Sequence, residues 1–230
     1  MQNVRYTTQG KKGGGITKEP VGIDWLDSYE RQEMNAFFAQ NLQKPALFLS
    51  SEALKVVSHL GYGVISQIRL GKNSAPFPMV KLQTMDAPDI PHRAGVEPII
   101  RPIARLIRNL ALDELVQLLH VSTDPNKPGT MMFLGARRPQ LPEEVYRRER
   151  ALTYMGHKDL FKQYMEIHDK TEPAIFTPES LITRHPATLP YYKACAESVI
   201  WYYHNASKEV DLVLLTGILA AGAHILVPQL

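Results

Sequence analysis

Apolar residues recur at helical spacing along most of the chain, and they alternate with polar residues only in short stretches. Residues 23–42 and 51–60 show the helical period, with Asp24 as a candidate N-cap. The segment "PALFLSS" between them predicts a short strand, and residues 64–70 and 78–84 alternate as strands do. The N-terminal part of the chain therefore predicts helices combined with a β-hairpin.

From Pro98 onward the pattern becomes mainly helical. Helices are predicted over residues 99–120, 142–154, 158–169, 188–206 and 209–222, with a strand at 130–136. The fold class that follows is mainly α: helical with a few short β-strands, mostly in the N-terminal third.

Composition breaks divide the chain into segments. Residues 1–20, with Lys11 and Lys12 beside three glycines, predict a flexible basic arm. Prolines crowd residues 85–98 and predict a loop or linker. We therefore expect an α+β N-terminal lobe at 21–90 and a helical lobe at 91–230, the latter containing a strand–helix–helix unit at 131–168.

The overall composition is that of a globular protein, with 44% apolar residues and a formal net charge of +3. The single cysteine, Cys195, excludes an intramolecular disulfide and a cysteine-built zinc site and suits a cytoplasmic location. The longest apolar run, residues 210–227, contains Asp211 and His224, so it predicts a buried helix or subunit interface and no membrane partner.

Three arginines define the first basic feature. Arg101, Arg105 and Arg108 follow the i, i+4, i+7 spacing that places side chains on one helix face. A solvated surface is the plain interpretation, with the arginine stems covering apolar neighbours. The alternative is a phosphate-rich partner that relieves the repulsion among three guanidinium groups.

The second basic feature is the stretch "LPEEVYRRERALTYMGHKDLFKQYMEI", residues 141–167. Leu141-Pro142 followed by Glu143 and Glu144 is a helix-start signal, since acidic residues favour the positive end of the helix dipole. Gly156 ends this helix, and a second amphipathic helix follows. An ordinary helical hairpin is the plain interpretation.

With the strand "TMMFLGARRPQ" before it, this order of elements resembles the ribbon–helix–helix DNA-binding fold. The resemblance implies that Ala136, Arg138 and Gln140 face base edges, whereas Arg137 points inward. His157 and Lys158 would then hold a phosphate at the start of the second helix. The full predicted nucleic-acid-binding set is Arg101, Arg105, Arg108, Arg137, Arg138, Gln140, His157, Lys158, Lys11 and Lys12.

Catalytic signatures are weak in this sequence. None of the eight histidines has a metal-binding spacing, and Cys195 and His204, nine residues apart on one predicted helix, cannot form a nucleophile–base pair. The sequence thus predicts no catalytic residue, no metal and no cofactor.

The resulting hypothesis is an oligomeric DNA-binding transcriptional regulator, a homo-oligomer through its apolar C-terminal helices. Two alternatives stay open at this point: an RNA-packaging nucleocapsid or coat-type protein, and a protein–protein adaptor of a larger assembly.

Overall fold

The computed structural model describes residues 21–84, 102–109, 112–124, 126–127, 129–182 and 188–226. A short helix α1 (Val21–Leu26) leads into the long helix α2 (Tyr29–Ser58). Ser28 separates them and caps α2 by accepting a hydrogen bond from the Arg31 amide, as an N-cap serine does.

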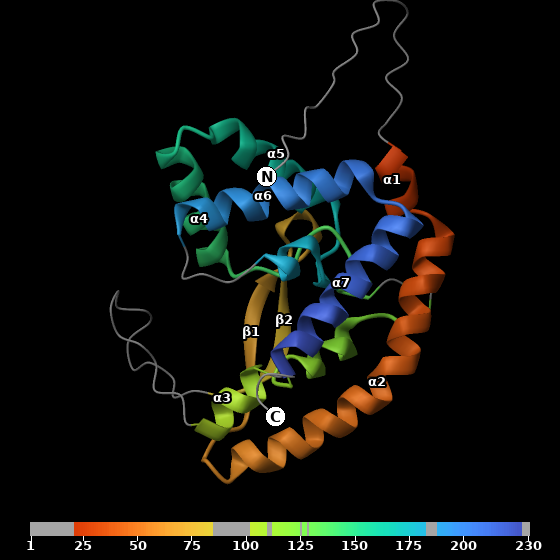
Figure 1. The fold of residues 1–230 in the computed structure, drawn as a ribbon, viewed down its shortest axis with the longest axis vertical. Helices are drawn as coiled ribbons and strands as arrows, with labels where there is room; N and C mark the ends of the chain where they lie inside the picture. The colour runs from red at the N-terminus through yellow and green to blue at the C-terminus, as the bar shows by residue number, and fades with distance from the viewer. Residues whose placement is uncertain are drawn as a thin grey trace, which may run out of the picture.

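Helix α2 continues through Pro45, in a stretch where the sequence pattern predicts a strand. That prediction is wrong, because Ala46, Ser50, Ala53 and Val57 all point into the protein at helical spacing. Their packing offsets the roughly 3 kcal/mol that an internal proline costs a helix. The helix is visibly bent in Figure 1, as expected when a proline interrupts the hydrogen-bond ladder.

A β-hairpin follows α2. Strands β1 (Val64–Leu70) and β2 (Pro76–Leu82) pair antiparallel, with Val64 opposite Leu82 and Leu70 opposite Pro76. The short 3-10 turn η1 (Lys72–Ser74) joins them and has Asn73 and Ser74 at positive φ. Both strands agree with the alternating pattern of the sequence.

The predicted helix over 99–120 is instead two separate elements within the described residues. These are α3 (Pro102–Asn109) and the 3-10 helix η2 (Leu115–His120), which begins after Asp113 and Glu114. The amide of Leu82 donates to the carbonyl of Asp113 (3.0 Å), so η2 begins beside the end of β2.

A second, two-stranded sheet lies in the interior of the protein. Strand β3 (Met132–Leu134) pairs in parallel with β4 (Ala174–Phe176), a strand that the sequence pattern does not reveal. A ribbon–helix–helix protein instead pairs this strand with the same strand of a second chain. Phe133 and Leu134 are almost completely buried here, so β3 is a core strand and cannot enter a DNA groove.

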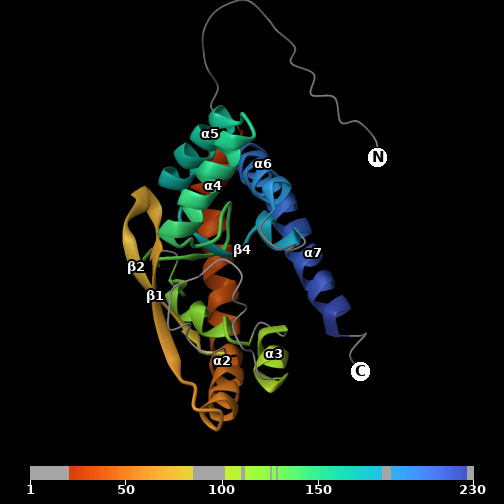
Figure 2. The same ribbon diagram turned by 90° about the vertical axis from the view of Figure 1, so that its left-hand side faces the viewer.

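The remaining helices agree closely with the periodicity: α4 (Pro142–Tyr154), α5 (Lys158–Lys170), α6 (Leu189–Asn205) and α7 (Lys208–Leu226), with the 3-10 turn η3 (Pro178–Leu181) between α5 and α6. Figure 1 shows α4, α5 and α6 gathered at one end, with the hairpin running away from them. Turned by 90°, the hairpin and α7 lie on opposite sides (Figure 2).

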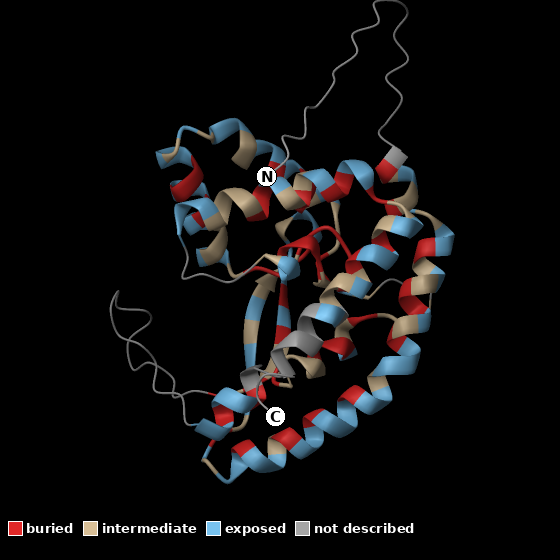
Figure 3. Cartoon of the chain, viewed as in Figure 1, coloured by how far each residue is buried: buried red, intermediate tan, exposed pale blue. Residues whose placement is uncertain are grey.

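The main hydrophobic core joins residues that are far apart in the sequence, from Leu26 to Leu214. Phe133 is at its centre, with its ring stacked on Phe38 and edge-on to Phe176. In Figure 3 many of the buried positions gather in the middle of the molecule. The mainly α fold class is confirmed. The division into lobes at residues 85–98 falls outside the described residues and stays a prediction.

Candidate functional site

The arginine stripe predicted from the sequence is only partly described. Arg105 is exposed on α3, and Arg108 lies in the same helix without a described side chain. Arg101, Lys11 and Lys12 lie outside the described residues. The described residues therefore do not test whether these side chains form one surface, and the arginine stripe stays a prediction.

Arg137, on the segment after β3, is completely buried, and its hydrogen bonds to described residues go to backbone carbonyls. Its guanidinium donates to the carbonyl oxygens of His168 (3.1 Å), Leu70 (3.2 Å) and Thr171 (3.0 Å). Burial lowers its pKa to about 10. Arg137 fastens the hairpin to the end of α5 and cannot reach an external ligand.

Gln140 is likewise buried. With its amide oriented to suit its neighbours, it donates to the Tyr164 hydroxyl (2.9 Å) and accepts from Arg148 Nη2 (3.0 Å). Arg148 in turn donates to the Glu179 carboxylate (2.8 Å), and its guanidinium lies 4.4 Å from the Tyr164 ring centroid. This buried network joins α4 to α5 and η3, and it occupies both the amide nitrogen and the amide oxygen of Gln140.

His157 and Lys158 lie at the start of α5, beyond the far end of α4 from Arg138 and Glu144. Thirteen helical residues separate the two ends, or about 20 Å along the axis. The structure therefore does not unite them with Arg138 in one site.

Arg138 belongs to a different group, which we call the arginine–carboxylate cluster: Arg69, Arg138, Glu114 and Glu144. Glu144 lies between the two arginines, with Arg69 Nη1 at 3.3 Å and Arg138 Nη2 at 3.7 Å. The Glu144 carboxylate also accepts from the Leu141 amide (3.0 Å), which fixes it at the start of α4. The helix-start signal read from the sequence thus positions a residue of the cluster.

Each arginine of the cluster has an unused donor. The Nε atoms of Arg69 and Arg138 are buried and have no hydrogen-bond partner among the described residues. Buried polar atoms without a partner are rare in folded proteins, and two in one cluster indicate a place for a ligand that accepts hydrogen bonds.

The pKa values of Arg69 and Arg138 are shifted in opposite directions. Burial lowers the pKa of Arg69, and the charges of Glu144 and Glu114 only partly offset this. Burial acts in the same direction on Arg138, but Glu179 and Glu144 outweigh it and raise the pKa. Both side chains remain cationic at neutral pH, so the cluster holds two fixed positive charges.

Asp113 directly precedes Glu114 of the cluster, so two carboxylates stand in a row there. Asp113 is only 5% exposed, and Glu114 is close enough for its charge to raise the pKa of Arg69. The sequence does contain a signal for this pair: "LALDELVQLL" places two acidic residues inside an otherwise apolar run. Neither residue was among the functional residues predicted from the sequence.

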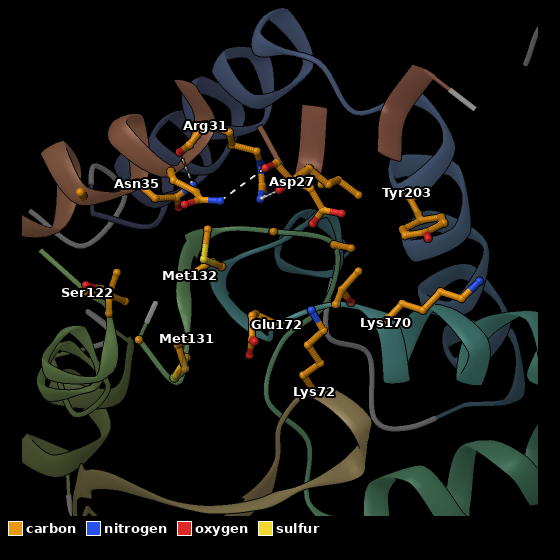
Figure 4. Close-up of a pocket in the computed structure, with 18 of the residues that line it drawn as sticks. Asp27, Arg31, Asn35, Lys72, Ser122, Met131, Met132, Lys170, Glu172 and Tyr203 are labelled. Carbon is orange, nitrogen blue, oxygen red and sulfur yellow. Dashed lines mark hydrogen bonds between the residues drawn. The ribbon is translucent and has the colours of Figure 1, made fainter. Parts of the chain in front are cut away.

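A separate cavity of about 670 Å³ lies between the start of α2, the η1 turn and the end of α5 (Figure 4). Arg31 and Asn35 line it from α2, Lys72 from η1, and Lys170 and Glu172 from the end of α5. Neither Arg69, Arg138, Glu114 nor Glu144 contributes to its wall. The protein therefore contains a cavity apart from the arginine–carboxylate cluster.

A metal centre and a cysteine nucleophile have no support among the described residues. In the described part of the chain, no group of three or more His, Cys, Asp or Glu side chains is placed to hold a metal ion. Cys195 is buried, and burial raises the pKa of its thiol, which opposes a role as a nucleophile.

Comparison with known proteins places the chain in a family. The family model "bacterial sugar transferase" matches residues 34–222, and the chain therefore belongs to the bacterial sugar transferase family. It is similar to a curated Caulobacter vibrioides protein, UDP-glucose:undecaprenyl-phosphate glucose-1-phosphate transferase, with 31% identity over 133 residues. The match covers 55% of this chain and 46% of the relative, so the chain spans about half the length of the protein it resembles.

These findings correct the functional hypotheses from the sequence. The ribbon–helix–helix resemblance is wrong, as are the DNA-binding regulator and the nucleic-acid partner that depended on it. The basic residues that suggested it have other surroundings: Arg137 is buried against backbone carbonyls, and Arg138 pairs with Glu144.

The length and apolar content of a helix decide whether it can cross a membrane. Among the described helices, including the 30-residue α2, none is both long enough and apolar enough to cross a bilayer.

Proposed function

We propose that this chain transfers a sugar 1-phosphate from a nucleoside-diphosphate sugar to a polyprenyl phosphate. Membership of the sugar transferase family supports the class of reaction, and the name of the Caulobacter relative supports the two substrates. Because a polyprenyl phosphate is a lipid, the proposal also replaces the expectation that the protein has no membrane partner. A cytoplasmic location stays a prediction.

The proposed reaction exchanges one phosphoanhydride for another. A phosphate oxygen of the lipid becomes bonded to the phosphorus that carries the sugar. The bond between that phosphorus and the oxygen of the nucleoside monophosphate breaks, and the monophosphate leaves with the electron pair. The sugar keeps its own phosphate throughout, so the products are a lipid-linked diphosphate sugar and a nucleoside monophosphate.

Such a reaction brings two anionic substrates together, so its site must neutralise phosphate charge. The arginine–carboxylate cluster has this capacity, because two cationic side chains with unused Nε donors converge there. Preorganised donors of this kind stabilise the charge that develops on transferring phosphoryl groups. The pair of buried, partnerless Nε donors is the observation that carries the assignment of the site.

Asp113 and Glu114 complete the proposed site. A carboxylate beside bound phosphates can attack phosphorus or hold a cation that bridges the phosphates. Asp113 is mostly buried at the end of β2, and Glu114 contacts the cluster through its charge. We assign the transfer chemistry to this end of η2 and not to the Cys195 region.

A transfer assay tests the proposal. The purified chain, in detergent with undecaprenyl phosphate, is incubated with radiolabelled UDP-glucose, UDP-galactose or UDP-N-acetylglucosamine. The label should move into the organic phase with at least one donor, and UMP should be released in equal amount. If the Caulobacter relative is active in the same assay while this chain gives neither product with any donor, the proposal is wrong.

A further inference from the structure

The cavity of Figure 4 is not explained by phosphate transfer. It lies next to the arginine–carboxylate cluster along the chain, since Gly135 and Ala136 form part of its wall and Arg138 follows them. Arg137, between them, is directed into the protein interior. The cavity is thus close to the proposed transfer site but has its own lining.

Some polar groups of the lining are already engaged. Arg31 donates to the Asp211 carboxylate (3.1 Å) and to the Leu134 carbonyl (2.7 Å), so its charge is neutralised inside the protein. The Asp124 carboxylate accepts from the backbone and side chain of Asn126. These groups shape the cavity and leave little capacity for a ligand.

Four charged ends in the lining have no hydrogen bond among the described residues. They are the ammonium groups of Lys72 and Lys170 and the carboxylates of Asp27 and Glu172. Their two positive and two negative charges cancel. A phosphate dianion therefore gains no net attraction from the cavity.

A neutral ligand with many hydroxyl groups suits this arrangement better. Each hydroxyl can donate to a carboxylate and accept from an ammonium, so all four charged ends can be satisfied together. The Gln32 side chain adds an amide to the lining, and Tyr203 and Met131 add apolar surface on which the carbon face of a sugar ring can lie. The volume falls within the range of small-molecule sites.

We propose that the cavity between α2, η1 and the end of α5 is a binding site for a neutral saccharide. Its lining alone supports this, and only its connection to a sugar donor rests on the proposed function. The saccharide can be the sugar of the nucleotide donor, or a glycan that reaches the protein separately.

Saturation-transfer difference NMR on the full chain tests the inference with glucose, galactose and N-acetylglucosamine as probes. At least one of them, at millimolar concentration, should show saturation transfer to its ring protons. Gln32→Trp fills the cavity and should abolish the signal. Gln40→Trp makes the same replacement at an exposed position of α2 outside the cavity and should retain it.

A second variant, Asp27→Ala, separates loss of saccharide binding from misfolding of Gln32→Trp. Asp27 is exposed, so Asp27→Ala should leave the fold intact and weaken the saccharide about tenfold or more, as loss of a charge-assisted hydrogen bond does. The inference is overturned if no probe binds, if binding survives both Gln32→Trp and Asp27→Ala, or if inorganic phosphate or UMP displaces the saccharide.

Competition with UDP-glucose and with UMP identifies whether the bound saccharide is the sugar of the donor or a separate glycan. Displacement by UDP-glucose but not by UMP shows that the cavity holds the sugar of the donor. Saccharide binding that neither nucleotide affects shows that it holds a separate glycan. The transfer assay measures release of UMP independently of these binding experiments. A failure of the saccharide-site proposal can therefore be distinguished from a failure of the proposed transferase function.

Discussion

Arg31, near the start of α2, and Asp211, in α7, form an ion pair with 3.1 Å between Nε and Oδ2 although 180 residues separate them. Both side chains are almost completely buried. The Asp211 carboxylate also accepts from the Tyr202 hydroxyl and from Trp25 Nε1. One carboxylate thus holds α1, α2, α6 and α7 together. Burial acts to lower the pKa of Arg31, but the charges and hydrogen bonds of Tyr202 and Asp211 outweigh it and raise the pKa.

Asp211→Ala should destabilise the protein by about 3–5 kcal/mol, because it leaves the Arg31 charge buried and unpaired. The free energy of unfolding in urea measures the effect. Glu30→Ala is the matched control: it removes the carboxylate of an exposed ion pair with Lys208 and should change the stability little. Equal effects of the two replacements would show that the buried pair has no special importance.

His168 should make the stability depend on pH. Burial lowers its pKa to about 4, whereas an unfolded histidine titrates near 6.5. Below about pH 6.5 the unfolded chain therefore binds a proton that the folded chain does not, and stability falls as the pH decreases toward 4. Between about pH 7.5 and pH 5 the contribution is roughly 2 kcal/mol.

Urea unfolding at these two pH values checks the contribution of His168. In His168→Leu the loss of stability on acidification should be smaller by that amount than in the unsubstituted protein. The two proteins differ only at position 168, so the difference between their pH dependences reports on His168. An unchanged pH dependence in His168→Leu would contradict the assignment.

Gly135 is required for the close approach of β3 and β4. A Cβ atom at this position would lie 2.6 Å from the Cβ of Ala174, which is completely buried. Gly135→Ala should therefore destabilise the protein by about 1–3 kcal/mol, as overpacking of a core does. Gly63→Ala, where a Cβ meets no atom within 4 Å, should change the melting temperature little.

The elements that could be predicted from the sequence are those specified by local signals. The hairpin follows from the alternation in residues 64–70 and 78–84, and α4 from Leu141-Pro142 followed by two glutamates. Strand β4 has only three residues and pairs with β3, about 40 residues earlier, so its own sequence carries too weak a pattern. Helix α2 passes through Pro45 because tertiary packing overrides local propensity.

The candidate site was misread for a related reason. Charge and helical spacing suggest a basic surface, but whether an arginine faces solvent depends on partners far away in the sequence. Arg148 pairs with Glu179, and Arg69 pairs with Glu144, 75 residues later. No periodicity in a single sequence reveals such partners, so Arg137, which is buried against backbone carbonyls, was interpreted as a nucleic-acid-binding residue.

The arginine–carboxylate cluster should be sensitive to loss of a single guanidinium. Arg138→Gln keeps a polar side chain of similar length but removes the charge and the unused Nε donor. If this donor stabilises phosphate charge in the transition state, the rate of UMP release should fall about 10²–10³-fold. Arg147→Gln, at an exposed position of α4, is the matched control and should retain the original rate. Both variants should fold, because Glu144 keeps its pair with Arg69 and Glu179 keeps its pair with Arg148, and circular dichroism and urea unfolding check this. A folded Arg138→Gln variant with full activity would remove Arg138 from the transfer site, and the same measurements on Glu114→Gln would show whether the neighbouring carboxylates belong to it.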